Sequence, residues 1–363
     1  MRSNEPRSSL IVSDVTMPGG VGTHIRDLTI AACGRGWAVA VLLDSGRGSD
    51  SIADALQELR VTVHRGPLHP RHSSEDDIRA TVLRAIEISR PDIIHVQCGS
   101  PKSAILPRQL ALDSSIPLLF TENYVSADSI NEELLARLKT IYLRAHAVIS
   151  VCDHNRDLLR NELGLVANHH VVIRYGVRLL PPRPSVRDTR KTICVARLTH
   201  QKGIDVLLRA FSLVSHTDIG ITLAGSGELD SDLRRMAEEL GLGKRVHFAG
   251  WVEDIAARLD SSDLFVLPSR SEGQPIALLE ALAAGLPSIA SAVSGIPEAL
   301  AGGSYGALVP PEDPRALSTA ITAYYDNPTD LRSRVRAARH HLRLHHDPAT
   351  NLSRVVDLWE SAL

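Results

Sequence analysis

Nearly continuous apolar runs alternate with amphipathic stretches along this chain. In the first half, six such runs predict β-strands at 9–15, 38–43, 61–64, 92–97, 117–121 and 147–151, and helices are predicted at 22–34 and 75–90. Runs that are apolar throughout, rather than at every second position, are typical of strands buried on both faces. The pattern therefore predicts a parallel sheet with helices on both sides.

The segment at 175–189, YGVRLLPPRPSVRDT, interrupts this alternation and predicts an interdomain linker, because it is rich in Pro and Arg. A second set of strands follows at 192–196, 220–224, 246–249, 264–267 and 288–291, with helices at 203–215, 229–240, 254–259, 275–284 and from 314 onward. The chain is therefore predicted to hold two doubly wound α/β domains, at 1–176 and 177–345. A C-terminal helix at 346–363 is expected to cross back to the first domain. Ligands of such sheets bind at the carboxyl ends of the strands, so the cleft between the domains is the expected site.

The composition indicates an ordinary water-soluble protein. The 363 residues are 44% apolar and 23% charged, with a formal net charge of −2, which argues against a nucleic-acid or membrane-surface partner. No apolar run reaches the roughly 18 residues of a membrane span, and the polar first nine residues lack a signal-peptide core. The four cysteines lie far apart and show no metal-binding spacing. We therefore predict reduced thiols and a cytoplasmic location.

One carboxylate lies inside the most apolar helix of the chain. In SRSEGQPIALLEALAAGLP, residues 269–287, every position from Ile276 to Ala284 is apolar except Glu280, and Pro275 and Gly285 mark the ends of the predicted helix. A helix that is apolar all round is normally buried, and a buried carboxylate needs hydrogen-bond donors. A bound ligand or a nearby arginine are the two sources of such donors.

Cations and glycines follow several of the predicted strands. Arg197 and Lys202 come just after a strand and are suited to a diphosphate, although a solvated loop is the simpler alternative. Glycine-rich turns occur at 17–24, MPGGVGTH, and around Gly225 in LAGSGELD. Glycines let a backbone approach a ligand closely, but tight turns also need them for steric reasons alone.

Together these pieces resemble the GT-B glycosyltransferases of family 4. The matching runs are VARLTHQKGIDVLLRA, LAGSGELDSDLRRMAEELGLGKRVHFAGWVED, SRSEGQPIALLEALAAGLPSIASAVSGIPEAL and GALVPPEDPRAL, with GGVGTH and DIIHVQ in the first half. The resemblance covers nearly the whole chain. It implies an α/β fold of two Rossmann-like, doubly wound parallel-sheet domains that face a central cleft.

The resemblance also implies roles for the matching positions. The residues implied in catalysis, which also grip the diphosphate and the transferred sugar, are Glu272, Arg197 and Lys202. Those implied in binding the rest of the donor are Gly20, Gly22, Gly225, Trp251, Val252, Gly273, Gln274, Pro275, Ile276 and Glu280, with Glu280 accepting from the ribose. Those implied in binding the acceptor or the sugar are His24, Glu122 and Asn123.

Two positions depart from the family pattern. The family often has Thr-x-His where this chain reads TENY, so Asn123 replaces a histidine and cannot act as a base. The family shows Asn-Gly-Val where this chain has Tyr175 before Gly176. The contact made by the missing histidine is therefore in doubt, and a satisfied core or surface role is the alternative for His24.

The resemblance implies a retaining, metal-independent transfer of a hexosyl or N-acetylhexosaminyl group, with a nucleotide-diphospho-sugar as co-substrate and no other cofactor. UDP is the favoured nucleotide. The short polar loops of the first domain, at 45–51, 68–74, 99–102 and 124–131, favour a small hydroxylated acceptor such as an aminocyclitol or another secondary-metabolite core. The sequence is compatible with a homodimer. The alternatives are a nucleotide-sugar epimerase and a catalytically silent nucleotide-sugar-binding protein. The basic run at 331–346 is interpreted as a solvated helix face, with a lipid or polyanion surface as the lesser alternative.

Overall fold

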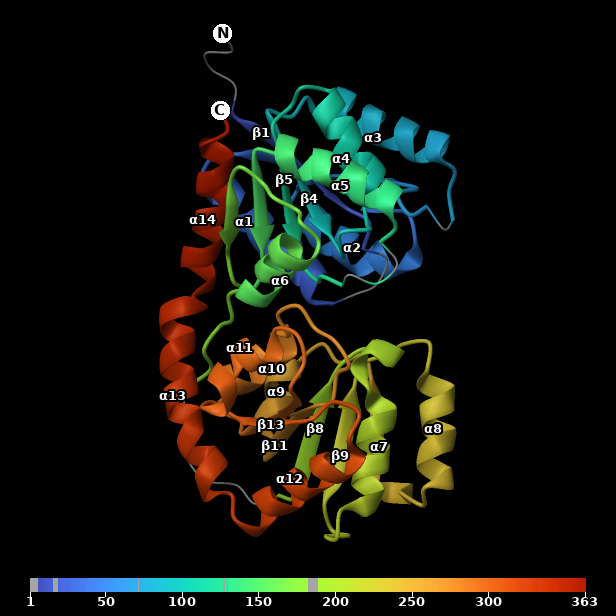
Figure 1. The fold of residues 1–363 in the computed structure, drawn as a ribbon, viewed down its shortest axis with the longest axis vertical. Helices are drawn as coiled ribbons and strands as arrows, with labels where there is room; N and C mark the ends of the chain where they lie inside the picture. The colour runs from blue at the N-terminus through green and yellow to red at the C-terminus, as the bar shows by residue number, and fades with distance from the viewer. Residues whose placement is uncertain (1–5, 16–18, 71, 127, 129, 182–188) are drawn as a thin grey trace. The chain divides into compact units, whose positions relative to one another are not determined.

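The computed structural model describes residues 6–15, 19–70, 72–126, 128, 130–181 and 189–363. The chain forms two compact units: unit 1 comprises Met1–Gly176 and Pro348–Leu363, and unit 2 comprises Val177–Asp347. Each unit is a parallel sheet with helices packed on both faces (Figure 1). The predicted fold class, two Rossmann-like parallel-sheet domains, is confirmed. Residues 182–188 of the predicted linker lie outside the described residues.

Unit 1 contains a seven-stranded parallel sheet in the order β3-β2-β1-β4-β5-β6-β7. Its strands are β1 (Ser8–Ser13), β2 (Ala38–Asp44), β3 (Thr62–Gly66), β4 (Ile93–Cys98), β5 (Leu118–Glu122), β6 (Ala147–Ser150) and β7 (His170–Val172). The strand order reverses between β1 and β4, and the loops that leave these two strands diverge there. In open α/β sheets this switch point forms a crevice at the carboxyl edge.

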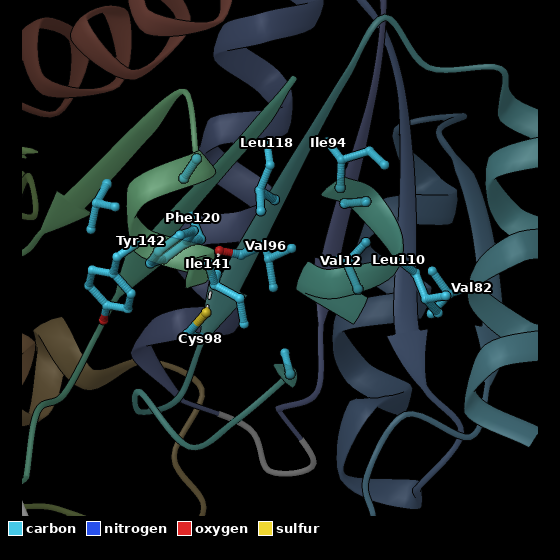
Figure 2. Close-up of a cluster of buried hydrophobic side chains, with 14 of the residues drawn as sticks. Val12, Val82, Ile94, Val96, Cys98, Leu110, Leu118, Phe120, Ile141 and Tyr142 are labelled. Carbon is cyan, nitrogen blue, oxygen red and sulfur yellow. Dashed lines mark hydrogen bonds between the residues drawn. The ribbon is translucent and has the colours of Figure 1, made fainter. Parts of the chain in front are cut away.

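Helices cover both faces of this sheet. They are α1 (Gly20–Gly34), α2 (Asp50–Glu58), α3 (Glu75–Ser89), α4 (Ile105–Asp113), α5 (Glu132–Arg144), the short α6 (Asp153–Asp157) and α14 (Pro348–Glu360). One core lies between the sheet and α3, α4 and α5, where Val12, Val96 and Phe120 are almost completely buried (Figure 2). A second core lies on the opposite face, beneath α1, α2 and α14.

The C-terminal helix α14 belongs to unit 1. Trp359 of α14 is fully buried, and its ring lies edge-on to Trp37 with centroids 5.3 Å apart. Its indole Nε1 donates to His95 Nδ1 of β4 at 3.1 Å. Arg35 at the end of α1 forms ion pairs with Asp357 and Glu360. These contacts fix the end of the chain on the face of the sheet that α1 covers.

Unit 2 contains a six-stranded parallel sheet in the order β10-β9-β8-β11-β12-β13, so its switch point lies between β8 and β11. The strands are β8 (Lys191–Val195), β9 (Gly220–Ala224), β10 (Val246–Gly250), β11 (Leu264–Leu267), β12 (Ser288–Ser291) and β13 (Ala307–Val309). The helices are α7 (Ile204–Leu213), α8 (Asp230–Glu239), α9 (Ile255–Asp260), α10 (Ile276–Ala283), α11 (Ile296–Ala299), α12 (Pro314–Asp326) and α13 (Thr329–His345). Helices α7, α8 and α12 pack on one face, and α9, α10, α11 and α13 pack on the other.

The apolar runs located eleven of the strands in the described chain, and two were missed. Strands β7 and β13 have three residues each and form the last strand at one edge of their sheets. Their residues are mostly half-buried, so they lack the continuous apolar run that marks the central strands. An edge strand pairs on one side only, and it needs less apolar surface for burial.

Candidate active site

Four loops at the carboxyl edge of the unit 2 sheet are joined by backbone hydrogen bonds. Gly225 N, after β9, donates to Gly250 O at the end of β10 at 2.7 Å. Leu198 N, after β8, donates to Ser226 O at 3.0 Å, and Arg270 N, after β11, donates to Gln201 O at 2.8 Å. The loops after β10, β9, β8 and β11 therefore form one continuous surface that carries the predicted donor residues.

Two glycines allow this close packing. Gly225 has φ +142°, and a Cβ there would collide with Ala196 O. Gly203 has φ +63°, and a Cβ there would collide with Pro268 O of the loop after β11. These glycines are thus needed for loop-to-loop contact, which is the steric role that the sequence left open for Gly225.

Replacing Gly203 by alanine should lower the free energy of unfolding by about 2–4 kcal/mol, because a strained left-handed backbone and a steric clash add together. Gly241 is a matched control, since it has φ +67° but nothing within 4 Å of the position that a Cβ would take. Gly241→Ala should cost only about 1 kcal/mol. Urea denaturation of both variants measures the difference, and equal costs would contradict the close approach.

Lys202 and Glu272 form an ion pair at the switch point of unit 2. Lys202 Nζ lies 2.6 Å from Glu272 Oε1, and the two side chains are 15% and 6% exposed. Ser269 Oγ donates to the same oxygen at 2.7 Å. Glu272 Oε2 has no donor among the described residues, and Lys202 keeps two N–H groups that lack acceptors there. The pair thus holds both groups in place while leaving each able to bind further partners.

Arg197 lies at the same edge and has no carboxylate partner among the described residues. Among the described residues its guanidinium bonds only to Gln201 Oε1, at 3.3 Å, and the residue is half-buried. Arg270 from the neighbouring loop differs, because it pairs with Asp205 through two bonds of 2.8 Å and with Glu312 at 2.8 Å. Arg270 therefore has a structural role, whereas Arg197 keeps most of its five donors available for an anion.

Glu280 lies in the second turn of α10 and is half-buried. Within the described part of the chain no donor lies within hydrogen-bond distance of its carboxylate, and no arginine pairs with it. Burial raises the pKa of Glu280 to about 7. The sequence left two sources of donors open, and the structure supplies none from the described protein residues.

The start of α10 adds unpaired backbone donors. Helix α10 follows Pro275, and its first bonds run from Leu278 N and Leu279 N to Pro275 O. In the described structure the N–H groups of Gly273, Ile276 and Ala277 have no acceptor. Such amides at a helix start favour a negative charge. Gln274 beside them is buried.

Trp251 and Val252 follow Gly250 at the end of β10. Trp251 is 56% exposed, and Val252 is half-buried. A flat exposed ring at this edge is available for stacking on a planar group.

In unit 1, the predicted phosphate glycines have different environments. Gly20 is the first residue of α1. Gly22 is buried, and a Cβ there would lie 2.5 Å from Cδ1 of Ile52 in α2. Gly22 therefore serves the packing of α1 on α2, and a contact between its backbone and a phosphate stays a prediction.

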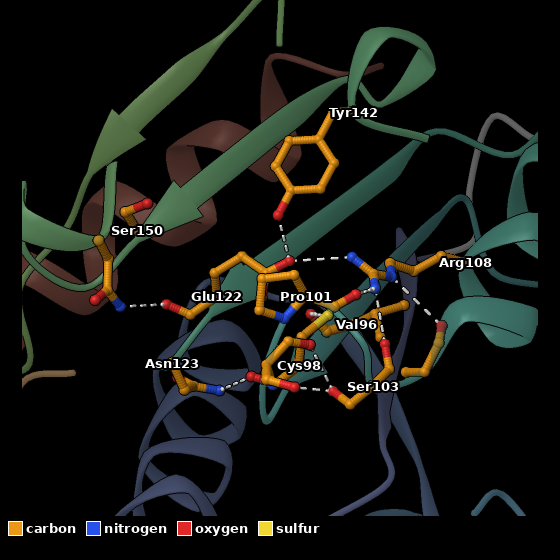
Figure 3. A network of polar contacts seen from close by, with 12 residues as sticks. Val96, Cys98, Pro101, Ser103, Arg108, Glu122, Asn123, Tyr142 and Ser150 are labelled. Atoms are coloured by element: carbon orange, nitrogen blue, oxygen red, sulfur yellow. Dashed lines mark hydrogen bonds and ion pairs between the residues drawn. The ribbon is translucent and has the colours of Figure 1, made fainter. Parts of the chain in front are cut away.

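The prediction that Glu122 contacts the acceptor is corrected by the structure. Glu122 is fully buried, and its Oε1 accepts from Arg108 Nη1 at 3.0 Å and from the Tyr142 hydroxyl at 2.6 Å (Figure 3). Arg108 is also fully buried and donates to the carbonyl oxygens of Pro101 and Ser103. The network ties the loop after β4 to β5, so Glu122 is a structural residue that no solvent-borne hydroxyl reaches here.

The two departures from the family pattern contact each other. The Tyr175 hydroxyl donates to Asn123 Oδ1, and Asn123 Nδ2 donates to Cys98 O at 2.9 Å. The ring of His24 lies edge-on to Tyr175 at 4.9 Å, and burial lowers the pKa of His24 to about 4. Both ends of the Asn123 amide are therefore engaged within the protein, and His24 is neutral at pH 7.

Sequence reasoning missed Asp14, which follows β1 directly and is 5% exposed. A lone acidic residue at the end of a buried strand was the available signal. Over the described residues, no group of three or more His, Cys, Asp or Glu side chains is arranged to hold a metal ion. None of the helices described is both long and apolar enough to cross a membrane.

Comparisons with known proteins agree with this architecture. The family description "Glycosyl transferase 4-like domain" matches residues 19–176, and "Glycosyl transferases group 1" matches residues 181–341. The putative colanic acid biosynthesis glycosyltransferase WcaL of Escherichia coli K12 is 33% identical over 270 residues, which cover 70% of this chain and 66% of WcaL. The chain thus spans just under two thirds of the length of that relative.

Solved structures give the same fold over nearly the whole chain. Anabaena Alr3699/HepE in complex with UDP and glucose has a TM-score of 0.83 at 18% identity, covering 98% of this chain and 100% of that one. Sucrose-phosphate synthase from Thermosynechococcus elongatus has a TM-score of 0.81 at 21% identity, covering 98% of each chain. Two doubly wound parallel-sheet units are the architecture of the GT-B class, to which these structural neighbours belong. This chain belongs to the family 4 glycosyltransferases of that class.

Proposed function

We propose that this protein is a retaining, metal-independent glycosyltransferase that moves a sugar from a UDP-sugar to a small hydroxylated acceptor. The observation that carries the proposal is the group of Arg197, Lys202, Glu272 and Glu280 at one edge of unit 2, with cations and carboxylates that have unused bonding capacity. The amide N–H groups at the start of α10 lie between Glu272 and Glu280 in the sequence.

The diphosphate binds to the cations in this proposal. Departure of UDP places negative charge on the β-phosphate as the sugar bond breaks. Arg197 offers a planar fork and Lys202 a point charge, and both are already held by protein contacts. Donors fixed in advance stabilise a developing charge more than a ground state, so they lower the barrier to transfer.

The carboxylates orient the uncharged parts of the donor. Glu272 Oε2 accepts a hydroxyl of the transferred sugar, while Oε1 stays with Lys202 and Ser269. Glu280 accepts the ribose hydroxyls and so obtains the donors that the described protein residues do not supply. Trp251 stacks beside the base. The choice of UDP is supported by the UDP that HepE contains.

A nucleotide panel tests the donor side of the proposal. UDP, GDP and ADP, each alone and as the glucose conjugate, are added to the protein, and its melting temperature is measured, because a ligand of the native state raises it. We expect the uridine compounds to give the largest rise. The products of subsequent transfer reactions are then examined by NMR for the anomeric configuration of the new bond. No rise with any nucleotide, or an inverted product, would contradict the proposal.

Removal of metal ions should leave the reaction unchanged. Because Arg197, Lys202 and the α10 amides neutralise the diphosphate in this scheme, treatment with EDTA should change kcat/KM by less than about twofold. The measurement is UDP release with and without chelator, followed by addition of Mg²⁺ or Mn²⁺. A loss that either ion restores would show that a metal shares this role.

A further inference from the structure

Asp14 occupies the switch point of unit 1. It follows the last residue of β1, where the loops from β1 and β4 diverge. Asp14 Oδ2 accepts from Ala104 N, in the loop after β4, at 2.8 Å. The carboxylate therefore bridges the two loops that border the crevice in which open α/β sheets bind their ligands.

Half of this carboxylate lacks a partner. Asp14 is 5% exposed, yet no other described residue donates to Oδ1, and no described cation forms an ion pair with the carboxylate. Burial raises the pKa of Asp14, and the Ala104 amide, the neighbouring His69 and Arg108 side chains and the backbone N–H of Asp14 itself oppose this rise. Oδ1 is not among the fully enclosed oxygens that lack a partner, so a molecule bound at this edge can reach it and donate a hydrogen bond to it.

Two further carboxylates at this edge differ from Asp14. Asp44, at the end of β2, accepts from the backbone N–H groups of Gly46, Leu68 and His69, so both of its oxygens have donors. Glu122, at the end of β5, is paired with Arg108. The second oxygen of Glu122, Oε2, has no donor in the described structure, but the protein encloses it completely, so no solute reaches it. Asp14 differs from both carboxylates, because its Oδ1 is neither paired with another described residue nor completely enclosed.

The backbone that holds Asp14 is strained. Ala104 has φ +49°, a left-handed conformation that non-glycine residues rarely adopt, and it precedes the first residue of α4. Its N–H is the one that bonds to Asp14. Strained residues persist where the surrounding structure fixes them, and they gather at functional sites.

We propose that Asp14 binds the acceptor of this enzyme, with Oδ1 accepting a hydrogen bond from an acceptor hydroxyl or ammonium group. This inference rests on the proposed function and deepens it. It makes the acceptor a molecule rich in hydrogen-bond donors, such as a polyol or an amino sugar, and it gives unit 1 one specificity-determining carboxylate.

The test uses myo-inositol and glucosamine as neutral and cationic probes. The full-length protein is first saturated with UDP, and each probe is then added to about 0.1 M while the melting temperature is measured. We expect at least one probe to raise the melting temperature further. In Asp14→Asn the amide oxygen still accepts from Ala104 N, while an NH₂ group replaces Oδ1. The apparent affinity for the probe should therefore fall about 10- to 100-fold.

Asp92→Asn is the matched control. Asp92 accepts from Ser8 N at 2.8 Å at the opposite, amino edge of the same sheet. This variant should bind the probes as the wild-type protein does, and both variants should bind UDP normally. If Asp14→Asn does not fold, Asp14→Ser, whose hydroxyl can accept from Ala104 N, replaces it.

The outcomes separate the two proposals. If UDP itself fails to raise the melting temperature, the proposed function is wrong. If UDP binds but neither probe does, or if the Asp14 variant binds the probes as tightly as the wild type, the role of Asp14 is wrong. An equal loss of UDP binding and probe binding in the Asp14 variant would also overturn the role of Asp14, because the substitution would then disturb the protein as a whole.

Discussion

Arg197→Ala should lower kcat for sugar transfer by about 10²- to 10³-fold and leave the fold intact. Gln201 is the partner of Arg197 among the described residues, and no ion pair is lost with the guanidinium. The stabilisation of the departing diphosphate is lost instead. Steady-state kinetics with the donor identified by the nucleotide panel, together with circular dichroism, checks both halves of this expectation.

Arg270→Ala is the contrasting variant. Arg270 pairs with Asp205 and Glu312 and bonds to His200 O, so its loss should reduce stability first and activity only through the fold. If folded Arg197→Ala protein keeps full activity, Arg197 does not bind the diphosphate.

The ion pair of Lys202 and Glu272 gives a separate prediction. Lys202→Met and Glu272→Gln should each impair transfer. Their combined effect should be less than the sum, because each removes the partner that positions the other.

Glu280→Gln should make the ligand-free protein more stable at pH 8 and at the same time weaken nucleotide binding. The pKa of Glu280 is raised from 4.5 to about 7, so between these values the folded state binds more protons than the unfolded state. The free energy of unfolding of the wild type therefore falls as the pH rises through this window. Above pH 7 the free energy of unfolding of the wild type has fallen by up to about 3 kcal/mol. The uncharged amide in Glu280→Gln avoids this loss.

Thermal denaturation from pH 4.5 to 8.5 measures the stability half of this prediction. The two proteins should be equally stable near the acid end and separate as the pH rises. Nucleotide affinity at pH 8, measured by calorimetry, should fall about 10- to 100-fold in Glu280→Gln, because hydroxyls bond less strongly to a neutral acceptor. Glu238→Gln, at an exposed position on α8, should change neither quantity. Unchanged nucleotide affinity in Glu280→Gln would show that Glu280 does not bind the ribose.

The glycines show which features of a turn can be predicted from neighbouring residues in the sequence. A glycine in a strand-to-helix turn is recognisable from its neighbours, and Gly225 lies where such a turn was predicted. Its partner is not recognisable, since the collision that only glycine avoids involves Ala196, which belongs to another loop. Gly22 looked equivalent in the sequence, and the side chain it packs against is Ile52 of α2. The difference depends on which element lies beside each turn.

The same limit applies to the charged residues. Glu122 and Asp14 both end a buried strand, and the sequence favoured Glu122. Arg108, on α4, pairs with Glu122 inside the core, while Asp14 accepts from the backbone amide of Ala104, 90 positions away. Nothing local to either residue signals which of them obtains a cation.

The sequence by itself determined two sheets of buried parallel strands, the break between them, and the order of cations, carboxylates and turns along the carboxyl edges. These features are encoded locally, because burial on both faces requires continuous apolar runs and tight turns require glycine. Only the tertiary structure decided which charges pair. Lys202 meets Glu272 across 70 residues because strand order places β8 beside β11. The free energy of a buried charge depends on the donors and cations around it, and these come from distant parts of the chain.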